Sequence, residues 1–190
     1  MKPLLLALAA STAPLAHAAL ASGDPAPAFE APASLAGHAF TFSLKDALAR
    51  GPVVVYFYPS AFTGGCNLEA HTFAVQHDRF AAAGASVVGV SLDDIARLNA
   101  FSADPDYCAG KLPVASDAGG RIARAYALGV RDAVPGRKDT RGNDIEHGFA
   151  ERSTFVVGTD GRVVAALEGL SPVENVERAL AIVQGLAARR

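Results

Sequence analysis

The first half of the chain contains two short runs dominated by apolar residues, at 53–58 (VVVYFY) and at 86–90 (SVVGV). Runs rich in β-branched and aromatic side chains, without polar alternation, are typical of strands buried on both faces of a sheet. The pattern therefore predicts two central strands. Shorter strands are expected at 39–42 and 114–117.

Each central run is followed by a segment with helical spacing. After a turn of small and polar residues at 60–65, apolar positions recur on one face up to Gly84: Ala70, Phe73, Ala74 and Phe80. Asp93 is the predicted N-cap of a second helix, whose packed positions are Ile95, Leu98 and Phe101. Asp117 precedes a third helix, packed through Ile122, Ala125 and Tyr126. Strand and helix thus alternate.

The C-terminal part predicts a hairpin and a helix. Residues 153–157 and 162–166 are strand patterns on either side of Asp160-Gly161, which is a strong hairpin signal. Ser171 and Glu174 have the spacing of a capping box, and apolar residues follow at helical spacing: Val173, Val176, Leu180 and Val183. We therefore expect an α/β fold, with a central mixed β-sheet and helices on both of its faces.

Two stretches lack this regularity. Residues 22–37 are rich in Pro, Ala and Gly, which is typical of an extended lead-in. Residues 129–149 are polar and irregular and predict a long surface loop. Acidic residues interrupt the basic ones between Arg131 and Arg141, so this loop is expected to be a solvated surface rather than an anion site.

Length and charge narrow the class of protein. The 190 residues suffice for one well-cored domain. The formal net charge of −2 gives no general attraction for nucleic acid or anionic membranes. Neither is expected as a partner, and function must lie in a few residues.

The N-terminus is typical of an export signal. Lys2 precedes an apolar stretch at 4–15, and Ala16-His17-Ala18 is a small-x-small cleavage signature. The apolar stretch is shorter than the roughly 20 residues needed to span a bilayer. We expect residues 1–18 to be a signal peptide, with cleavage at 21 as an alternative, and one domain over 22–190. The mature protein would be periplasmic, without stable membrane insertion.

The candidate chemistry lies in two cysteines, Cys66 and Cys108. In an exported protein their number alone favours a structural disulfide. Cys66, however, follows a central strand at the point where a helix begins. Unpaired N–H groups and the helix dipole there favour the nucleophilic thiolate.

The residues before and after Cys66 carry a resemblance. The spacing Pro59-x3-Thr63-x2-Cys66, followed by Glu69, is similar to the active-site signature of the peroxiredoxins, which are thiol peroxidases. The resemblance implies that Cys66 is the peroxidatic thiolate and that hydrogen peroxide or an alkyl hydroperoxide is the substrate. Thr63 would turn its hydroxyl toward the sulfur or the peroxide, Pro59 would shield the sulfur, and Glu69 would support the site. No cofactor or metal is implied.

Other parts of the chain resemble the same family. Residues 23–29 are similar to its opening segment, and residues 53–58 to the strand before its signature. Residues 151–157 resemble its arginine-bearing strand, which makes Arg152 the guanidinium that orients the peroxide. The resemblance implies a thioredoxin-like fold.

The subgroup most resembled is the Q-type, or bacterioferritin-comigratory-protein-like, peroxiredoxins. Some of these place a second cysteine five residues after the first, where this chain has His71. Cys108 resembles the variant whose resolving cysteine lies in the following helical region. It would form an intramolecular disulfide that a thioredoxin-like or other dithiol donor reduces, in a monomer or weak dimer; a structural or unpaired thiol is the alternative. Asn67 and the length of 129–149 depart from the family pattern.

Other functions of thioredoxin-like proteins would need residues that this part of the sequence does not offer. A thiol:disulfide oxidoreductase should carry Cys-x-x-Cys, but residues 64–69 contain one cysteine. The Trp of glutathione-peroxidase-like sites is absent. A non-catalytic module that binds a metal or a partner is a further alternative. A copper-binding module of this kind would need a second cysteine close to Cys66 and a histidine as ligands, and Cys66 has no such neighbour.

The histidines are not expected to act. His71 and His77 fall on different faces of the predicted helix, without metal-ligand spacing to Cys66. His38 and His147 lie in loop-like segments and are expected to be solvated.

Overall fold

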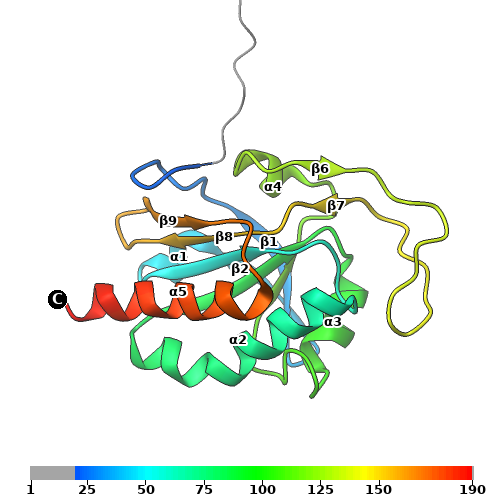
Figure 1. The fold of residues 1–190 in the computed structure, drawn as a ribbon, viewed down its shortest axis with the longest axis horizontal. Helices are drawn as coiled ribbons and strands as arrows, with labels where there is room; N and C mark the ends of the chain where they lie inside the picture. The colour runs from blue at the N-terminus through cyan, green and yellow to red at the C-terminus, as the bar shows by residue number, and fades with distance from the viewer. Residues whose placement is uncertain (1–19, 190) are drawn as a thin grey trace, which may run out of the picture.

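The protein is described by a computed structural model over residues 20–189, so the predicted signal peptide lies outside the described residues. Its centre is a seven-stranded sheet, built from β1 Glu30–Leu35, β2 His38–Ser43, β3 Val53–Phe57, β4 Ser86–Ser91, β5 Val114–Ser116, β8 Ser153–Val157 and β9 Val163–Leu167. The strand order is β2-β1-β5-β4-β3-β8-β9 (Figure 1). β3 pairs parallel to β4 and antiparallel to β8, so the sheet is mixed, as predicted.

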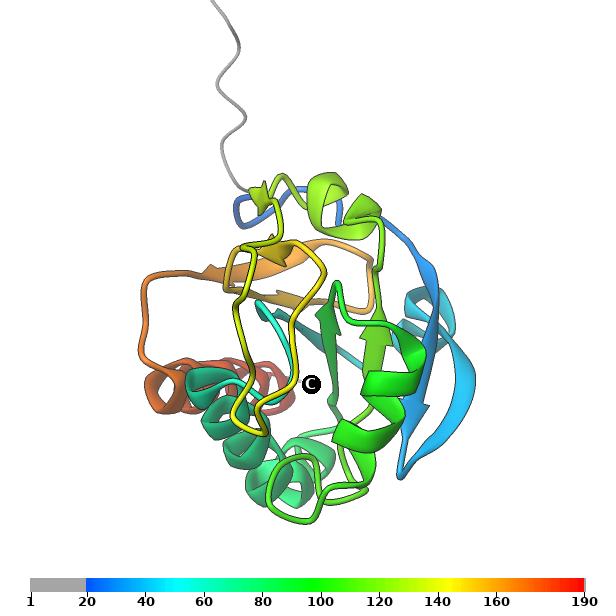
Figure 2. The ribbon, with the colours of Figure 1, turned by 90° about the vertical axis from the view of Figure 1, so that its right-hand side faces the viewer.

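Helices cover both faces of this sheet (Figures 1 and 2). They are α1 Leu44–Leu48, α2 Gly64–Ala82, α3 Ile95–Ala103, α4 Arg121–Ala125 and α5 Pro172–Ala187. Val54 and Tyr56 of β3 pack with α2, α3 and α5, whereas Val53, Val55 and Phe57 pack with α1 and α4. All five residues of β3 are therefore buried, which explains why this run lacks polar alternation.

The stretch at 22–37 was predicted to be an extended lead-in, and this was incomplete. It contains β1, which pairs antiparallel with both β2 and β5. The small side chains of EAPASL carry little strand propensity, so pairing rather than composition makes this strand. α1 was not predicted either; it has only five residues.

The predicted cap of α3 was wrong by one residue. Asp94 is the N-cap, and its Oδ1 accepts a hydrogen bond from the Arg97 N–H at 2.7 Å. The side chain of Asp93 instead points into the interior and is fully buried. The capping box of Ser171 and Glu174 and the β8–β9 hairpin were predicted correctly.

The loop at 129–149 folds back on the molecule. β6 Val130–Arg131 and β7 Phe149–Ala150 pair antiparallel at its base. The segment between them, residues 132–148, is called the strap here; Figure 2 shows it in yellow, passing in front of the sheet toward the first turn of α2. Most of its side chains are exposed, as predicted.

Within residues 20–189, no helix is long and apolar enough to cross a membrane.

Candidate active site

Cys66 is the third residue of α2 and follows β3 through a short turn, residues 59–63, called the active-site turn. The first bond inside the helix runs from the Asn67 N–H to the Thr63 carbonyl at 2.8 Å, so earlier amides have no intrahelical acceptor. The Cys66 side chain is 2% exposed and forms no disulfide. The thiol thus lies at the positive end of a 19-residue helix, next to unpaired donors.

Arg152 brings a cation to this sulfur. Its Nη2 lies 3.2 Å from Cys66 Sγ. Because β8 runs antiparallel to β3 with Ser153 opposite Phe57, the start of β8 lies where β3 ends and α2 begins. Gly65 leaves room for the guanidinium, since a Cβ there would lie 3.4 Å from Nη2. The sequence prediction that Arg152 and Cys66 meet is therefore matched by the geometry.

Glu69 holds the other side of the guanidinium. Its Oε2 is bound by Arg152 Nη1, and its Oε1 accepts from Asn175 Nδ2 at 2.6 Å. Asn175, on α5, also donates to Thr154 Oγ1 at 2.7 Å. Glu69 and Asn175 are both buried, so Arg152 is fixed by a chain of contacts rather than by solvent.

Sequence reasoning missed Asn175, although a signal for it existed. Its position is four residues before Ala179 and eight before Val183, on the buried side of α5. An asparagine on an otherwise apolar stripe indicates a buried hydrogen-bonding partner.

Thr63 and Pro59 lie as neighbours of the site. Thr63 donates its hydroxyl hydrogen to the Ser60 carbonyl at 2.8 Å and makes no side-chain cap for α2. The hydroxyl hydrogen is therefore not directed at the sulfur. Pro59 is partly exposed and lines, with Arg152, a cavity of about 480 Å³.

Cys108 lies in the turns after α3 and is fully buried. It packs in the same apolar cluster as Cys66. Burial, and then the nearby charge of Asp104, raise the pKa of its thiol. Both cysteines are free thiols. Because Cys108 is fully buried and its pKa is raised, its thiol is neutral and out of reach of solvent.

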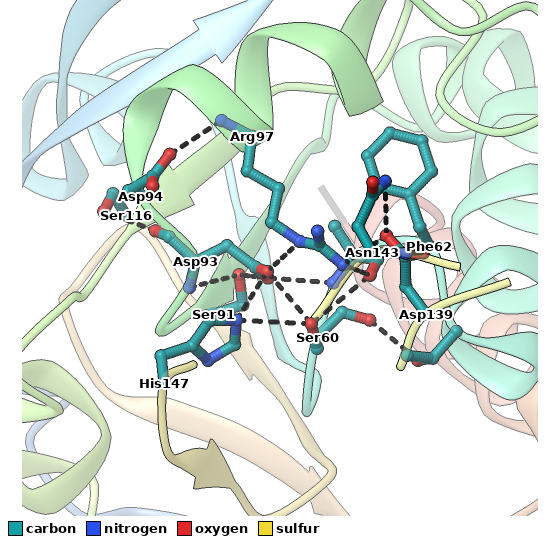
Figure 3. A network of polar contacts seen from close by, with 12 residues as sticks. Ser60, Phe62, Ser91, Asp93, Asp94, Arg97, Ser116, Asp139, Asn143 and His147 are labelled. Atoms are coloured by element: carbon teal, nitrogen blue, oxygen red, sulfur yellow. Dashed lines mark hydrogen bonds and ion pairs between the residues drawn. The ribbon is translucent and has the colours of Figure 1, made fainter. Parts of the chain in front are cut away.

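A second polar cluster lies behind the active-site turn and is centred on Asp93 (Figure 3). Its carboxylate accepts five hydrogen bonds, from Ser60 Oγ, Ser91 Oγ, Ala61 N, Arg97 Nε and His147 Nε2. Burial alone would raise the pKa of Asp93, but the hydrogen bond and charge of His147, with the bonds from Ser91 and Ala61, hold it below its usual range.

His147 was predicted to be solvated, and this was wrong. Its side chain is 20% exposed; Nε2 lies 2.8 Å from Asp93 Oδ1, and Nδ1 lies 2.7 Å from the Gly148 carbonyl oxygen. Burial alone would lower the pKa of His147, but Asp93 outweighs it and raises that pKa. No local pattern could have signalled this, because the strap carries His147 to a residue 54 positions away.

The strap also contacts the active-site turn directly. Thr140 donates its N–H and its hydroxyl to the Phe62 carbonyl, at 2.8 and 2.9 Å. Asn67 Nδ2 donates to Thr140 Oγ1 at 3.4 Å. Arg141 stays exposed, as predicted, but its guanidinium also stacks on the Phe62 ring. Asn67 and the long loop, the two features expected to depart from the family pattern, are thus in contact with each other.

Among the described residues, no three His, Cys, Asp or Glu side chains gather as metal ligands. The chemistry available is that of a thiol, a guanidinium and backbone donors at the start of a helix.

The sheet is mixed, helices cover both of its faces, and a cysteine lies at the start of α2. These features define a thioredoxin-like protein with a cysteine at its active site. The profile of the AhpC/TSA family matches residues 22–166. Peroxiredoxin Bcp of Xanthomonas campestris is 31% identical over 163 residues, which is 86% of this chain and 94% of that protein.

Two solved structures of peroxiredoxins have the same fold as this chain. Peroxidoxin BcpB of Mycobacterium tuberculosis superposes with a TM-score of 0.73 at 29% identity, over 88% of this chain and 98% of that one. Peroxiredoxin Q of Xanthomonas campestris gives 0.64 at 29% identity, over 82% and 90%. The chain belongs to the AhpC/TSA family, in the Q-type or Bcp group of peroxiredoxins, and it is a thiol peroxidase.

Proposed function

We propose that Cys66 is the peroxidatic residue. Its thiolate attacks one oxygen of a hydroperoxide, so that a sulfur–oxygen bond forms and the oxygen–oxygen bond breaks. The departing oxygen takes up a proton and leaves as water or an alcohol. Cys66 is oxidised by two electrons to a sulfenic acid, and the peroxide is reduced by the same two electrons.

The observation that carries this proposal is the 3.2 Å contact between Arg152 Nη2 and Cys66 Sγ. A guanidinium favours the anionic sulfur by direct charge and hydrogen bonding. The Arg152 side chain remains 25% exposed, which supports contact with an incoming peroxide. It also lines the 480 Å³ cavity beside Pro59, although Cys66 itself does not. The same cation can stabilise the negative charge that develops on the leaving oxygen.

The remaining predicted residues have supporting roles in this proposal. Thr63 Oγ1 has given its hydrogen to Ser60, so its lone pairs are free to accept a hydrogen bond from the peroxide O–H. Pro59 borders the approach and offers no N–H to water. Glu69 orients Arg152 through an ion pair in the interior.

For the second half of the cycle we propose Cys108 as the resolving thiol. Its sulfur attacks the sulfenic sulfur of Cys66, a disulfide forms, and the hydroxyl leaves as water. A thioredoxin-like or other dithiol donor then returns both thiols. Because Cys108 is fully buried and disulfide Cα atoms must come within about 7 Å, the turns around Cys108 or the first turn of α2 must rearrange.

We propose that the protein acts in the periplasm, because residues 1–18 have the pattern of an export signal. We also propose that it acts as a monomer or weak dimer. The intact mass of protein from a periplasmic extract tests the location: a chain starting at residue 19 or 22 is expected, and a full-length chain confined to the cytoplasm would contradict it. Size-exclusion chromatography with light scattering tests the oligomeric state.

The activity is tested by consumption of hydrogen peroxide and of an alkyl hydroperoxide with dithiothreitol as reductant. Cys66→Ser should abolish turnover, whereas Cys108→Ser, treated with peroxide in the absence of dithiothreitol, should react once and then accumulate sulfenic acid. Turnover that is undiminished in Cys66→Ser would overturn the proposal. Non-reducing peptide mass spectrometry after peroxide should show a Cys66–Cys108 link within one chain; a link only between chains would exclude Cys108 as the intramolecular resolving residue.

A further inference from the structure

The active-site turn does not hold its shape through its own residues alone. Phe62 has a φ of 58°, in the left-handed region that a bulky side chain adopts at a cost of about 1 kcal/mol or more. Such a conformation persists only where surrounding contacts determine it. Those contacts come from two other parts of the chain.

The first half of the turn is held by Asp93 and Arg97. Asp93 Oδ2 accepts the Ala61 N–H at 2.8 Å, and Oδ1 accepts the Ser60 hydroxyl at 3.0 Å. Arg97 Nη2 donates to the Ala61 carbonyl at 2.9 Å. Both polar groups of the Ala61 backbone are therefore bound by one ion pair.

The second half is held by the strap, through the two bonds from Thr140 to the Phe62 carbonyl. The two anchors are joined, because Arg97 Nη2 also forms an ion pair with Asp139 at 2.9 Å. His147 completes the junction between the strap and Asp93 (Figure 3).

The two ring nitrogens of His147 each face an acceptor, Gly148 O and Asp93 Oδ1. A neutral imidazole has one N–H, so only the imidazolium can donate to both. A hollow of about 390 Å³ beside His147 allows protons to reach it from solvent. The charged groups around it are Asp93 and Arg97 in the cluster, and Asp94, Asp144 and Glu146 along the hollow.

A Ser-His-Asp triad is not the explanation of this cluster. Ser60 and Asp93 both approach Nε2 of His147, at 3.3 and 2.8 Å, instead of the two different nitrogens that a triad uses. Ser60 is also fully buried and cannot meet a substrate.

We propose that Asp93 and His147 are positioning residues for Cys66, and that protonated His147 strengthens the hold of Asp93, Arg97 and Thr140 on the active-site turn by joining the strap to Asp93. When the imidazolium loses one proton, the single N–H that remains can donate to Asp93 Oδ1 or to the Gly148 carbonyl but not to both, so one of the two bonds that fix the ring between the strap and Asp93 is lost. The turn then loosens and the alignment of Cys66 with Arg152 is degraded. This inference rests on the proposed role of Cys66 in peroxide reduction.

The test is the rate of Cys66 oxidation by hydrogen peroxide in single turnover, from about pH 6 to about pH 9, in wild type, His147→Leu and His147→Gln. Dividing the rates at each pH removes the effects of pH that the three proteins share. The ratio of wild type to His147→Leu should be about tenfold at low pH and approach one at high pH. His147→Gln, which donates from Nε2 without titrating, should recover part of the rate at every pH.

His38→Gln is the matched control, because His38 is exposed on the edge strand β2; its ratio to wild type should stay at one. A ratio for His147→Leu that is constant with pH would overturn the inference.

Nuclear magnetic resonance of the reduced protein gives a readout that is independent of activity. The His147 imidazole should carry protons on both nitrogens at about pH 6.5, where a free histidine is half neutral. A single N–H at that pH would overturn the inference. If wild type oxidises no peroxide at any pH, the proposed function fails, while this measurement still shows whether His147 is charged.

Discussion

Arg152 lies with one nitrogen of its guanidinium 3.2 Å from the Cys66 sulfur and the other bound by the buried carboxylate of Glu69. The cation is therefore oriented before any substrate arrives. The two residues are 86 positions apart, and the antiparallel register of β8 on β3 brings them together. The reactivity of the thiol thus depends on strand pairing as much as on the helix that carries it.

Arg152→Lys is expected to lower kcat/KM for hydrogen peroxide about 100-fold. A lysine keeps the charge but has no planar fork, so it cannot bind Glu69 and the sulfur at once. Stopped-flow measurement of Cys66 oxidation tests this. Arg178→Lys, at an exposed position of α5, is the control and should be unchanged. Equal rates in Arg152→Lys and wild type would show that the fork is not needed.

Asn175→Leu is expected to act on the site from a distance. It removes the donor to Glu69 Oε1 and Thr154 Oγ1, which leaves both acceptors unpaired in the interior. The free energy of unfolding should fall by about 2 kcal/mol, and the peroxide rate by about tenfold as Arg152 loses its fixed orientation. Urea denaturation and stopped-flow kinetics measure the two effects. A loss of stability with an unchanged rate would confine Asn175 to a structural role.

The local part of the site could be predicted from the sequence, because one strand end and one helix start carry it. Pro59, Thr63 and Cys66 are neighbours in the chain, and the resemblance of residues 151–157 to the family's arginine-bearing strand added Arg152 to them. Hydrophobic periodicity also predicted the central strands and the long helices, since burial on one or two faces sets that periodicity.

The support of the site could not be predicted in the same way. Two acidic residues follow β4, and propensity alone does not say that Asp94 caps the helix while Asp93 turns inward. His147 reaches Asp93 only because the strap folds back over the turn. Such contacts depend on the path of an irregular loop, which has no periodicity to read.

Thr140→Val isolates the side-chain bond between the strap and the active-site turn. The variant keeps the Thr140 N–H bond to Phe62 but loses the hydroxyl that contacts Phe62 and Asn67. Loss of about 1 kcal/mol should ease the rearrangement that joins Cys66 to Cys108, so the disulfide should form about fivefold faster. Less Cys66 should then be overoxidised to the sulfinic acid at high peroxide.

Quenched-flow alkylation and intact mass spectrometry measure the two species for Thr140→Val. Thr159→Val, at the exposed β8–β9 turn, is the control and should match wild type. Slower disulfide formation in Thr140→Val would mean that the strap promotes the rearrangement instead of opposing it.

Asp93 should contribute to the loss of folding stability at acid pH. Its pKa is held below the usual range when folded, so its contribution is present above the unfolded value of about 3.9 and is lost as pH falls through the folded value. Asp93→Asn should be less stable than wild type by about 3 kcal/mol at neutral pH, because Arg97 and His147 lose their buried partner. The difference should shrink below about pH 4, where wild type loses the same charge. Urea midpoints across this range test it, with the exposed Asp132→Asn as a control that parallels wild type; a difference that stays constant into acid would mean that Asp93 contributes through packing rather than through its charge.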